Sequence, residues 1–295
     1  MSGDELAAAY GALRPRLVRV AYAILGSRAE AEDVVADTWL RLVAQQEREP
    51  VRDLLGWGTV AVSRAAVDVL RSARVRREQY VGPWLPEPEV RDLDAPPAGG
   101  GQDPADRVSL DDSVRYALLV ALEQLTPAER TAWVLHDLFA VPFAEVAQVV
   151  GRSPEAVRTL ASRARRRVAD RTPRREVDRV EHDRVVSAFL GAAAGGDLHG
   201  LVALLDPDVV LTSDGGGVVS AARRPVLGSD RVARFLDGLR RKHPDDVLLP
   251  VEVNGRLGLA GTDGAGRRTL VASFTVDGGL VSRVDIVLAP AKLGR

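Results

Sequence analysis

The chain has 295 residues, and its 40 Lys and Arg against 41 Asp and Glu give a formal net charge of −1. With 46% hydrophobic residues it can bury sizeable cores, and its length predicts two or three globular domains. The absence of Cys excludes disulfides, Cys-bound zinc and thiol catalysis. No signal peptide and no membrane-spanning run is visible, so we expect a cytoplasmic protein that has no membrane partner and needs no metal or cofactor.

Residues 5–78 predict an all-α domain of three helices. Apolar residues recur at helical spacing up to Gly26, which ends the first helix. Ser27 and Glu30 have the spacing of a capping box and predict the start of the second helix. The third helix begins at about Asp53 and ends in a cluster of arginines, which are suited to contact phosphates.

Residues 79–113 differ in character from the helices on either side. They contain six Pro and four Gly and carry a net charge of −6, so they cannot form a packed core and predict a linker. Within residues 80–88, however, Tyr80, Trp84 and Leu85 lie among polar neighbours. A solvated spacer has no use for such side chains, so we expect an extended docking segment on which the C-terminal part of the chain packs.

Residues 114–171 predict a second all-α domain. A short helix at 142–150 ends at Gly151, and Ser153 followed by Pro caps a further helix that continues to about Arg171. Two helices joined by a short turn that contains Gly are typical of a helix-turn-helix.

The second helix of this motif carries a block of basic residues. Between positions 152 and 175, nine Arg stand against two acidic residues, which is typical of a surface that contacts a polyanion. The residues expected to face inward are Val157, Leu160, Ala164 and Val168. The opposite face suits a DNA major groove, with Arg158 and Arg163 as the expected base-reading residues. The candidate DNA contacts are Glu155, Arg158, Thr159, Ser162, Arg163 and Arg166.

Residues 176–290 predict an α+β domain. Two amphipathic helices come first, and the patterns of a curved antiparallel sheet follow, with a further helix at 230–241 among them. The expected strands are 209–212, 247–253, 256–260, 268–276 and 280–288.

The order of these parts resembles that of the bacterial extracytoplasmic-function (ECF) sigma factors of the sigma-70 family. Residues 29–41 are similar to the family's region 2.2, and residues 55–71 to the regions that melt and read the −10 promoter element. Residues 125–130 and the helix-turn-helix resemble region 4, which reads the −35 element. The resemblance implies a multidomain fold with two all-α sigma domains, and a protein that binds core RNA polymerase and directs promoter recognition and transcription initiation.

The resemblance also implies which residues bind, and no catalytic residue is among them. The expected contacts with core polymerase (its β′ and β subunits) are Asp33, Val34, Asp37, Thr38, Leu40 and Arg41. The expected contacts with the −10 element are Trp57, Arg64, Asp68, Arg71, Arg74, Arg76 and Arg77.

The C-terminal part resembles a SnoaL-like domain, the cone-shaped α+β fold shared with polyketide cyclases and ketosteroid isomerase. Sigma factors with this extension share three motifs, which are matched here by residues 80–88, 214–217 and 289–293. The resemblance implies that these motifs act between domains and modulate activity in cis. The residues concerned are Tyr80, Trp84, Leu85, Pro86, Asp214, Gly215, Gly216, Gly217, Pro290, Lys292 and Leu293.

Alternatives to this function stay open at the level of sequence. The chain could be a DNA-binding transcription regulator fused to a SnoaL-like domain that binds a small molecule or acts as an enzyme. His199, Asp206, Asp208 and Asp214 are available for catalysis, but the extension contains no Tyr or Trp to act as a donor opposite them. We therefore expect regulation without catalysis, and a small ligand of the C-terminal domain stays open.

Overall fold

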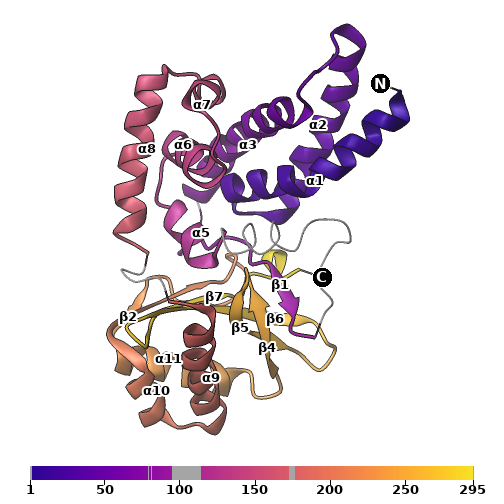
Figure 1. Cartoon of the computed structure of the whole chain (residues 1–295). Coiled ribbons are helices and arrows are strands. Elements are labelled where there is room, and N and C mark those ends of the chain that lie inside the picture. Colours follow the sequence, from indigo (N-terminus) through magenta and orange to yellow (C-terminus); the bar gives the residue numbers. More distant parts are fainter. Residues whose placement is uncertain (1, 79, 81, 95–113, 173–176, 295) are drawn as a thin grey trace. The chain divides into compact units, whose positions relative to one another are not determined.

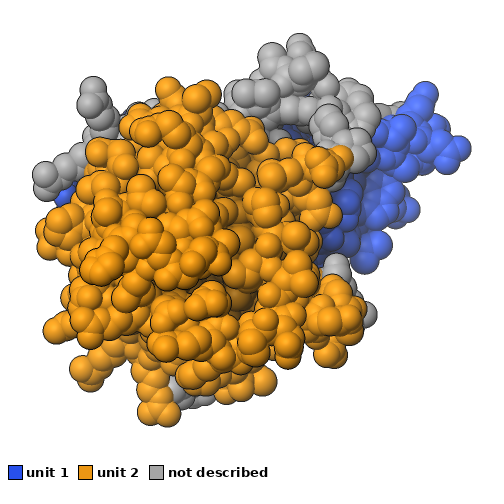
Figure 2. Space-filling view, turned by 90° about the horizontal axis from the view of Figure 1, so that it is seen from below, with its two compact units in different colours: residues 1–79, 121–170 blue, residues 80–120, 171–295 orange. Residues whose placement is uncertain are grey.

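The structure is a computed structural model that describes residues 2–78, 80, 82–94, 114–172 and 177–294 (Figure 1). The chain forms two compact units, which Figure 2 shows in different colours. Unit 1 comprises residues 1–79 and 121–170, and unit 2 comprises residues 80–120 and 171–295. None of the described helices is long and apolar enough to cross a membrane.

Unit 1 begins with three helices that pack against one another, α1 (Gly3–Leu25), α2 (Arg28–Arg48) and α3 (Leu54–Glu78). The predicted boundaries are present, because Gly26 caps α1 in a left-handed conformation and the Ser27 side chain accepts a hydrogen bond from the N–H of Glu30. The Tyr10 hydroxyl donates to the carbonyl of Val35 at 2.6 Å and ties α1 to α2.

The second part of unit 1 contains α6 (Pro127–Trp133), the π-helical turn η1 (Val134–Leu138), α7 (Phe143–Val150) and α8 (Pro154–Ala169). Gly151 has a φ of 71°, which ends α7 and lets the chain turn into α8. One detail of the predicted inward face was wrong: Ala161 is fully buried, whereas Leu160 is only half-buried. The close approach of α6 favours the smaller side chain at the helix contact.

Unit 2 is built on a seven-stranded sheet with the order β1-β4-β5-β6-β7-β2-β3. The strands are β1 (Val90–Asp92), β2 (Leu205–Asp214), β3 (Val226–Leu227), β4 (Val247–Val253), β5 (Arg256–Thr262), β6 (Arg268–Asp277) and β7 (Leu280–Val287). The helices α9 (Arg179–Gly195), α10 (Leu198–Leu204) and α11 (Ser229–Lys242) pack on the sheet (Figure 1). The apolar core between them includes Phe189 of α9 and Phe274 of β6. Outside this group, α5 (Tyr116–Leu122) begins in unit 2, and the 3₁₀ turn η2 (Pro290–Lys292) lies near the C-terminus.

The sheet is mixed, so the prediction of an antiparallel sheet was wrong. The hairpins β4–β5, β5–β6 and β6–β7 are antiparallel, but β2 lies parallel to β7. Alternation of apolar residues identifies a strand without identifying its partner, and here the partner of β2 is the last strand in the sequence.

A segment from the predicted linker also belongs to this sheet. Strand β1 pairs antiparallel with β4, with Val90 opposite Val253, and Arg91 forms an ion pair with Glu252. Residues 82–94 therefore lie on the C-terminal domain, and β1 extends its sheet at one edge. The predicted linker residues 95–113 lie outside the described part of the chain.

Candidate promoter, polymerase and regulatory surfaces

The exposed face of α8 brings together the residues predicted to contact the −35 element. Ser153 caps the helix by accepting from the N–H of Ala156 at 3.2 Å, and Val157 and Ala164 anchor the opposite face in the core. All six predicted contacts are exposed along a single helix: Glu155, Arg158, Thr159, Ser162, Arg163 and Arg166. Hydrogen bonds from its own N–H and from Ser153 at the helix start lower the pKa of Glu155.

Two further arginines of α8 have structural partners that the sequence pattern did not reveal. Arg167 forms an ion pair with the buried carboxylate of Glu129 at 2.8 Å, and Arg165 forms one with Asp137. Both partners precede α7 in the sequence, so the ion pairs hold α8 in place on the rest of the domain. The basic block therefore combines exposed residues predicted to contact DNA with residues that fix the helix.

The predicted polymerase contacts on α2 divide into an exposed and a buried group. Asp33, Asp37 and Arg41 are exposed, and Leu40 is 66% exposed, which is unusual for a large apolar side chain. Val34 and Thr38 are buried, and the Thr38 hydroxyl donates to the Val34 carbonyl at 2.8 Å. Only the exposed group can contact a partner without rearrangement of the helix.

The predicted −10 contacts lie along α3. Arg64, Asp68 and Arg71 are exposed, and Trp57 is half-buried against the helical core. Asp68 and Arg71 lie 3.6 Å apart as an ion pair. Arg74, Arg76 and Arg77 belong to the last turns of α3, but their side chains lie outside the described part of the structure.

Within unit 1, Arg64 of α3 contacts α7 of the helix-turn-helix. The Arg64 guanidinium donates through Nε and Nη2 to the carbonyl of Gln148 in α7, at 3.3 and 3.2 Å. Arg130 is 2% exposed and donates to the carbonyl of Ala23 at 3.2 Å while it pairs with Glu123. The contacts of Arg64 and Arg130 with the carbonyls of Gln148 and Ala23 could not be predicted from the sequence, because every residue carries a backbone carbonyl.

In unit 2, the buried carboxylate of Asp214 brings together residues from all three motifs of the C-terminal resemblance. Lys292 Nζ lies 2.6 Å from Oδ2 of Asp214, and the backbone N–H of Leu85 donates to the same oxygen at 2.9 Å. The other oxygen accepts from the Tyr80 hydroxyl and from the N–H of Gly216. We call this cluster of Tyr80, Trp84, Leu85, Asp214 and Lys292 the Asp214 clamp.

Lys292 contributes more to the clamp than its charge. Its ammonium group also donates to the Leu85 carbonyl at 2.6 Å and lies 3.0 Å from the centroid of the Trp84 ring. Tyr80 packs edge-on against Trp84 with their centroids 5.3 Å apart. Burial, together with the hydrogen bond to Asp214 and its negative charge, raises the pKa of Tyr80, so the phenol stays protonated and continues to donate.

The remaining residues of the three motifs shape the surroundings of the clamp. A Cβ on Gly215 would lie 2.0 Å from the Val219 carbonyl oxygen, and Gly216 has a φ of 69° with Ala289 close by, so both positions require glycine. Pro86 is buried and its carbonyl accepts from the Tyr116 hydroxyl at 2.8 Å. Leu293 is buried, whereas Gly217 and Pro290 are exposed.

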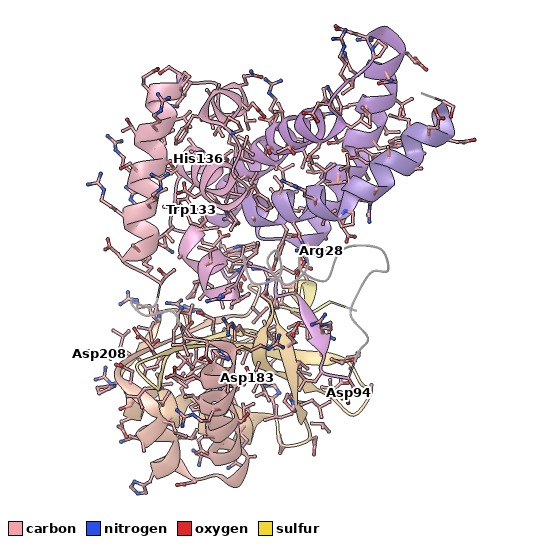
Figure 3. The ribbon with its side chains drawn as sticks, in the orientation of Figure 1. Arg28, Asp94, Trp133, His136, Asp183 and Asp208 are labelled. Carbon is pink, nitrogen blue, oxygen red and sulfur yellow. The ribbon has the colours of Figure 1, made fainter. Side chains whose placement is uncertain are left out.

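The candidate catalytic residues of the extension do not form a site. A cavity lies between the helices and the sheet of unit 2, but His199, Asp206 and Asp208 are not among its lining residues. His199 and Asp208 are exposed, and Figure 3 shows Asp208 at the outer side of unit 2. The carboxylate of Asp214 instead accepts hydrogen bonds from other residues of the Asp214 clamp. Among the described residues, no group of His, Asp and Glu is placed to hold a metal ion.

Comparison with known proteins agrees with this arrangement along the whole chain. Residues 9–76 match the family model of sigma-70 region 2, and residues 115–168 match that of sigma-70 region 4. The chain is 42% identical to the ECF RNA polymerase sigma factor SigJ of Mycobacterium tuberculosis, over 96% of this chain and 91% of SigJ. It is 36% identical to the probable ECF RNA polymerase sigma factor SigI of the same species, over 98% of this chain and 95% of SigI.

The similarity extends to three dimensions. The crystal structure of Mycobacterium tuberculosis SigJ superposes with a TM-score of 0.76 at 38% sequence identity, and the match covers 97% of both chains. The predicted fold class is thereby confirmed: two all-α sigma domains, the second with a helix-turn-helix, and a C-terminal α+β domain.

Proposed function

Because the chain belongs to the extracytoplasmic-function sigma factors of RNA polymerase, we propose that its exposed helix faces divide promoter recognition between them. The face of α2 with Asp33, Asp37, Leu40 and Arg41 binds core polymerase. The exposed face of α8 reads the −35 element, and α3 contacts the −10 element. Exposure on separate helices supports this assignment, and Val34 and Thr38 act behind the polymerase-binding face by packing it.

We propose, from the contact of Arg64 with Gln148, that the free protein is closed, which means that the two sigma domains touch through α3 and α7. The −35 and −10 elements are about 25 base pairs apart, which is roughly 85 Å of duplex at ~3.4 Å per base pair. While α3 and α7 touch through Arg64, the two sigma domains cannot reach the −10 and the −35 element at the same time. Unit 1 must therefore open on the promoter, and Arg64 must exchange the Gln148 carbonyl for DNA.

The Asp214 clamp supports a role of the C-terminal domain in controlling this opening. The clamp and β1 fix residues 82–94 on unit 2, and these residues belong to the connection between the two sigma domains. Fixing part of the connection shortens the free tether that must extend when the domains separate. The C-terminal domain then restrains the sigma factor in cis without catalysis, and no catalytic site is needed for this role.

A reversible cross-link tests whether opening is required. Since the chain has no Cys, Arg64→Cys with Gln148→Cys gives two unique attachment points for a reducible bismaleimide. We expect the cross-linked protein to lose run-off transcription with core polymerase, and reduction to restore it, because the two modules can separate again. The single-Cys variants treated in the same way are the controls. Full activity of the cross-linked protein would contradict the closed state.

A further inference from the structure

Arg158, one of the two arginines expected to read bases of the −35 element, contacts an aromatic ring of the neighbouring helix. Its guanidinium carbon lies over the ring of Phe143 in α7, 5.4 Å from the ring centroid, which is within the range of a cation–π contact. Its Nη1 is also 3.6 Å from a carboxylate oxygen of Glu155, about one turn earlier on α8. Arg163, the second of the two arginines, has no ring contact or ion pair with any residue that the structure describes. The free protein therefore restrains Arg158 more than Arg163.

The ring of Phe143 is itself fixed by the turn between η1 and α7. It stacks on the ring of His136, which Figure 3 labels, with the centroids 3.6 Å apart and the planes inclined by 26°. Nδ1 of His136 lies 3.0 Å from the carbonyl oxygen of Val141. Ala140 has a φ of 55°, and the N–H of Val141 donates back to the carbonyl of Leu135 at 2.8 Å. The reversed chain thus places Phe143 on the histidine ring.

Such a restraint matters for an arginine that reads a base. Arginine identifies guanine by two parallel hydrogen bonds, which require its N–H groups at a defined place and in a defined plane. A long exposed side chain loses rotamer freedom when it forms them, and this loss opposes binding. The Phe143 ring offers no hydrogen-bond acceptor, and the Glu155 oxygen at 3.6 Å is beyond hydrogen-bond distance, so the N–H groups of Arg158 stay available.

We propose that Phe143 is a positioning residue for recognition of the −35 element. It orients Arg158 toward one base pair, and His136 supports the ring from within the domain. The preference for that base pair then depends on a side chain of α7, whereas the preference at the base pair read by Arg163 does not. This inference rests on the proposed function of α8, because it takes Arg158 as a base-reading residue.

Promoter variants test the proposal with the full chain bound to core polymerase. The −35 base pairs are changed one at a time, and run-off transcription gives the base preference at each position. Arg158→Ala and Arg163→Ala first identify the base pair that each arginine reads. Phe143→Leu removes the ring but keeps an apolar side chain, and it should lower the preference at the Arg158 base pair about two- to fivefold. The preference at the Arg163 base pair should stay unchanged and is the internal control.

Three further variants separate positioning from packing. Phe143→Tyr keeps the ring and should retain the wild-type preference. His136→Gln keeps a donor for the Val141 carbonyl but removes the stacked ring, so it should lower the preference at the same base pair to a smaller extent, and it tests the proposal even if Phe143→Leu does not fold. Phe143→Leu combined with Arg158→Ala should show the same preference as Arg158→Ala alone, because the ring acts through the arginine.

The possible failures of this experiment can be told apart. If Phe143→Leu lowers transcription without changing any base preference, or relaxes both base pairs equally, the ring only packs the domain and the proposal is overturned. If Arg158→Ala changes no base preference, the assignment of the exposed face of α8 to the −35 element fails as well. A change in Arg158→Ala without one in Phe143→Leu or His136→Gln would overturn the role of Phe143 alone.

Discussion

The Asp214 carboxylate is buried, and its donors come from stretches of chain far apart in the sequence. Tyr80 and Leu85 precede it by more than 100 residues, and Lys292 follows it by 78. Each hydrogen bond to a charged acceptor contributes more than a neutral one, but only while the ammonium group of Lys292 balances the buried charge. Asp214 thus holds the start of residues 82–94 on the domain, and the pairing of β1 with β4 holds the end.

Replacing Lys292 should therefore release this segment. Lys292→Met leaves the Asp214 charge buried without its cation, which should cost the clamp about 3–5 kcal/mol and increase hydrogen exchange of residues 82–94. Asp214→Asn combined with Lys292→Met removes both charges and should recover part of the loss. Arg267→Met is the control, because it breaks an exposed ion pair with Asp263 and should change little. Equal exchange in all variants would show that the clamp does not hold the segment.

At the scale of elements, α8 carries the residues proposed to read DNA together with residues that fix the helix. Arg166 is exposed on the face proposed to contact DNA, whereas its neighbour Arg167 pairs with the buried Glu129. We therefore expect adjacent arginines to have different roles. The position of the helix depends on the ion pairs of Arg165 and Arg167, which are already formed without DNA.

These two neighbours provide a matched pair of variants. Arg166→Ala should weaken binding to all DNA sequences and reduce its salt dependence, because one phosphate contact is lost, and thermal stability should stay unchanged. Arg167→Ala should lower the melting temperature as well, because Glu129 is left buried without its partner. DNA binding at several salt concentrations and thermal unfolding measure both effects. A stability loss in Arg166→Ala equal to that in Arg167→Ala would contradict the division of roles.

At the scale of the whole molecule, unit 2 contains residues that precede the second sigma domain in the sequence and residues that follow it. Residues 82–94 pack with the C-terminal domain, although more than 100 residues separate them along the chain from β2, β4 and β7. The C-terminal domain therefore contacts part of the connection between the two sigma domains directly.

Removal of the C-terminal domain should reveal this effect. A chain that ends at residue 172 loses the partners of Tyr80, Trp84 and β1, so the connection is free and run-off transcription from a cognate promoter should rise several-fold. Trp84→Ala should give part of the increase, because it removes the ring that covers Lys292. Val218→Ala, at a position that is 82% exposed, is the control. Unchanged activity in the truncated protein would show that the domain does not restrain the sigma factor.

The sequence by itself determined the helix ends and the family, but not the short strands β1 and β3. Ser27, Gly26, Ser153 and Gly151 mark helix ends through local hydrogen bonds and backbone conformation, which depend on neighbouring residues alone. The exposed face of α8 followed from helical periodicity. The apolar residues at 80–88 indicated a docking segment for a different reason, because an apolar side chain without a local partner needs a distant one.

Only the tertiary structure decided which distant groups meet. The parallel pairing of β2 with β7, the donation of Arg64 to the Gln148 carbonyl and the convergence of Tyr80, Asp214 and Lys292 join residues separated by about 70 to 200 positions. Backbone hydrogen-bonding groups are the same at every residue, so no pattern in the sequence identifies their partners.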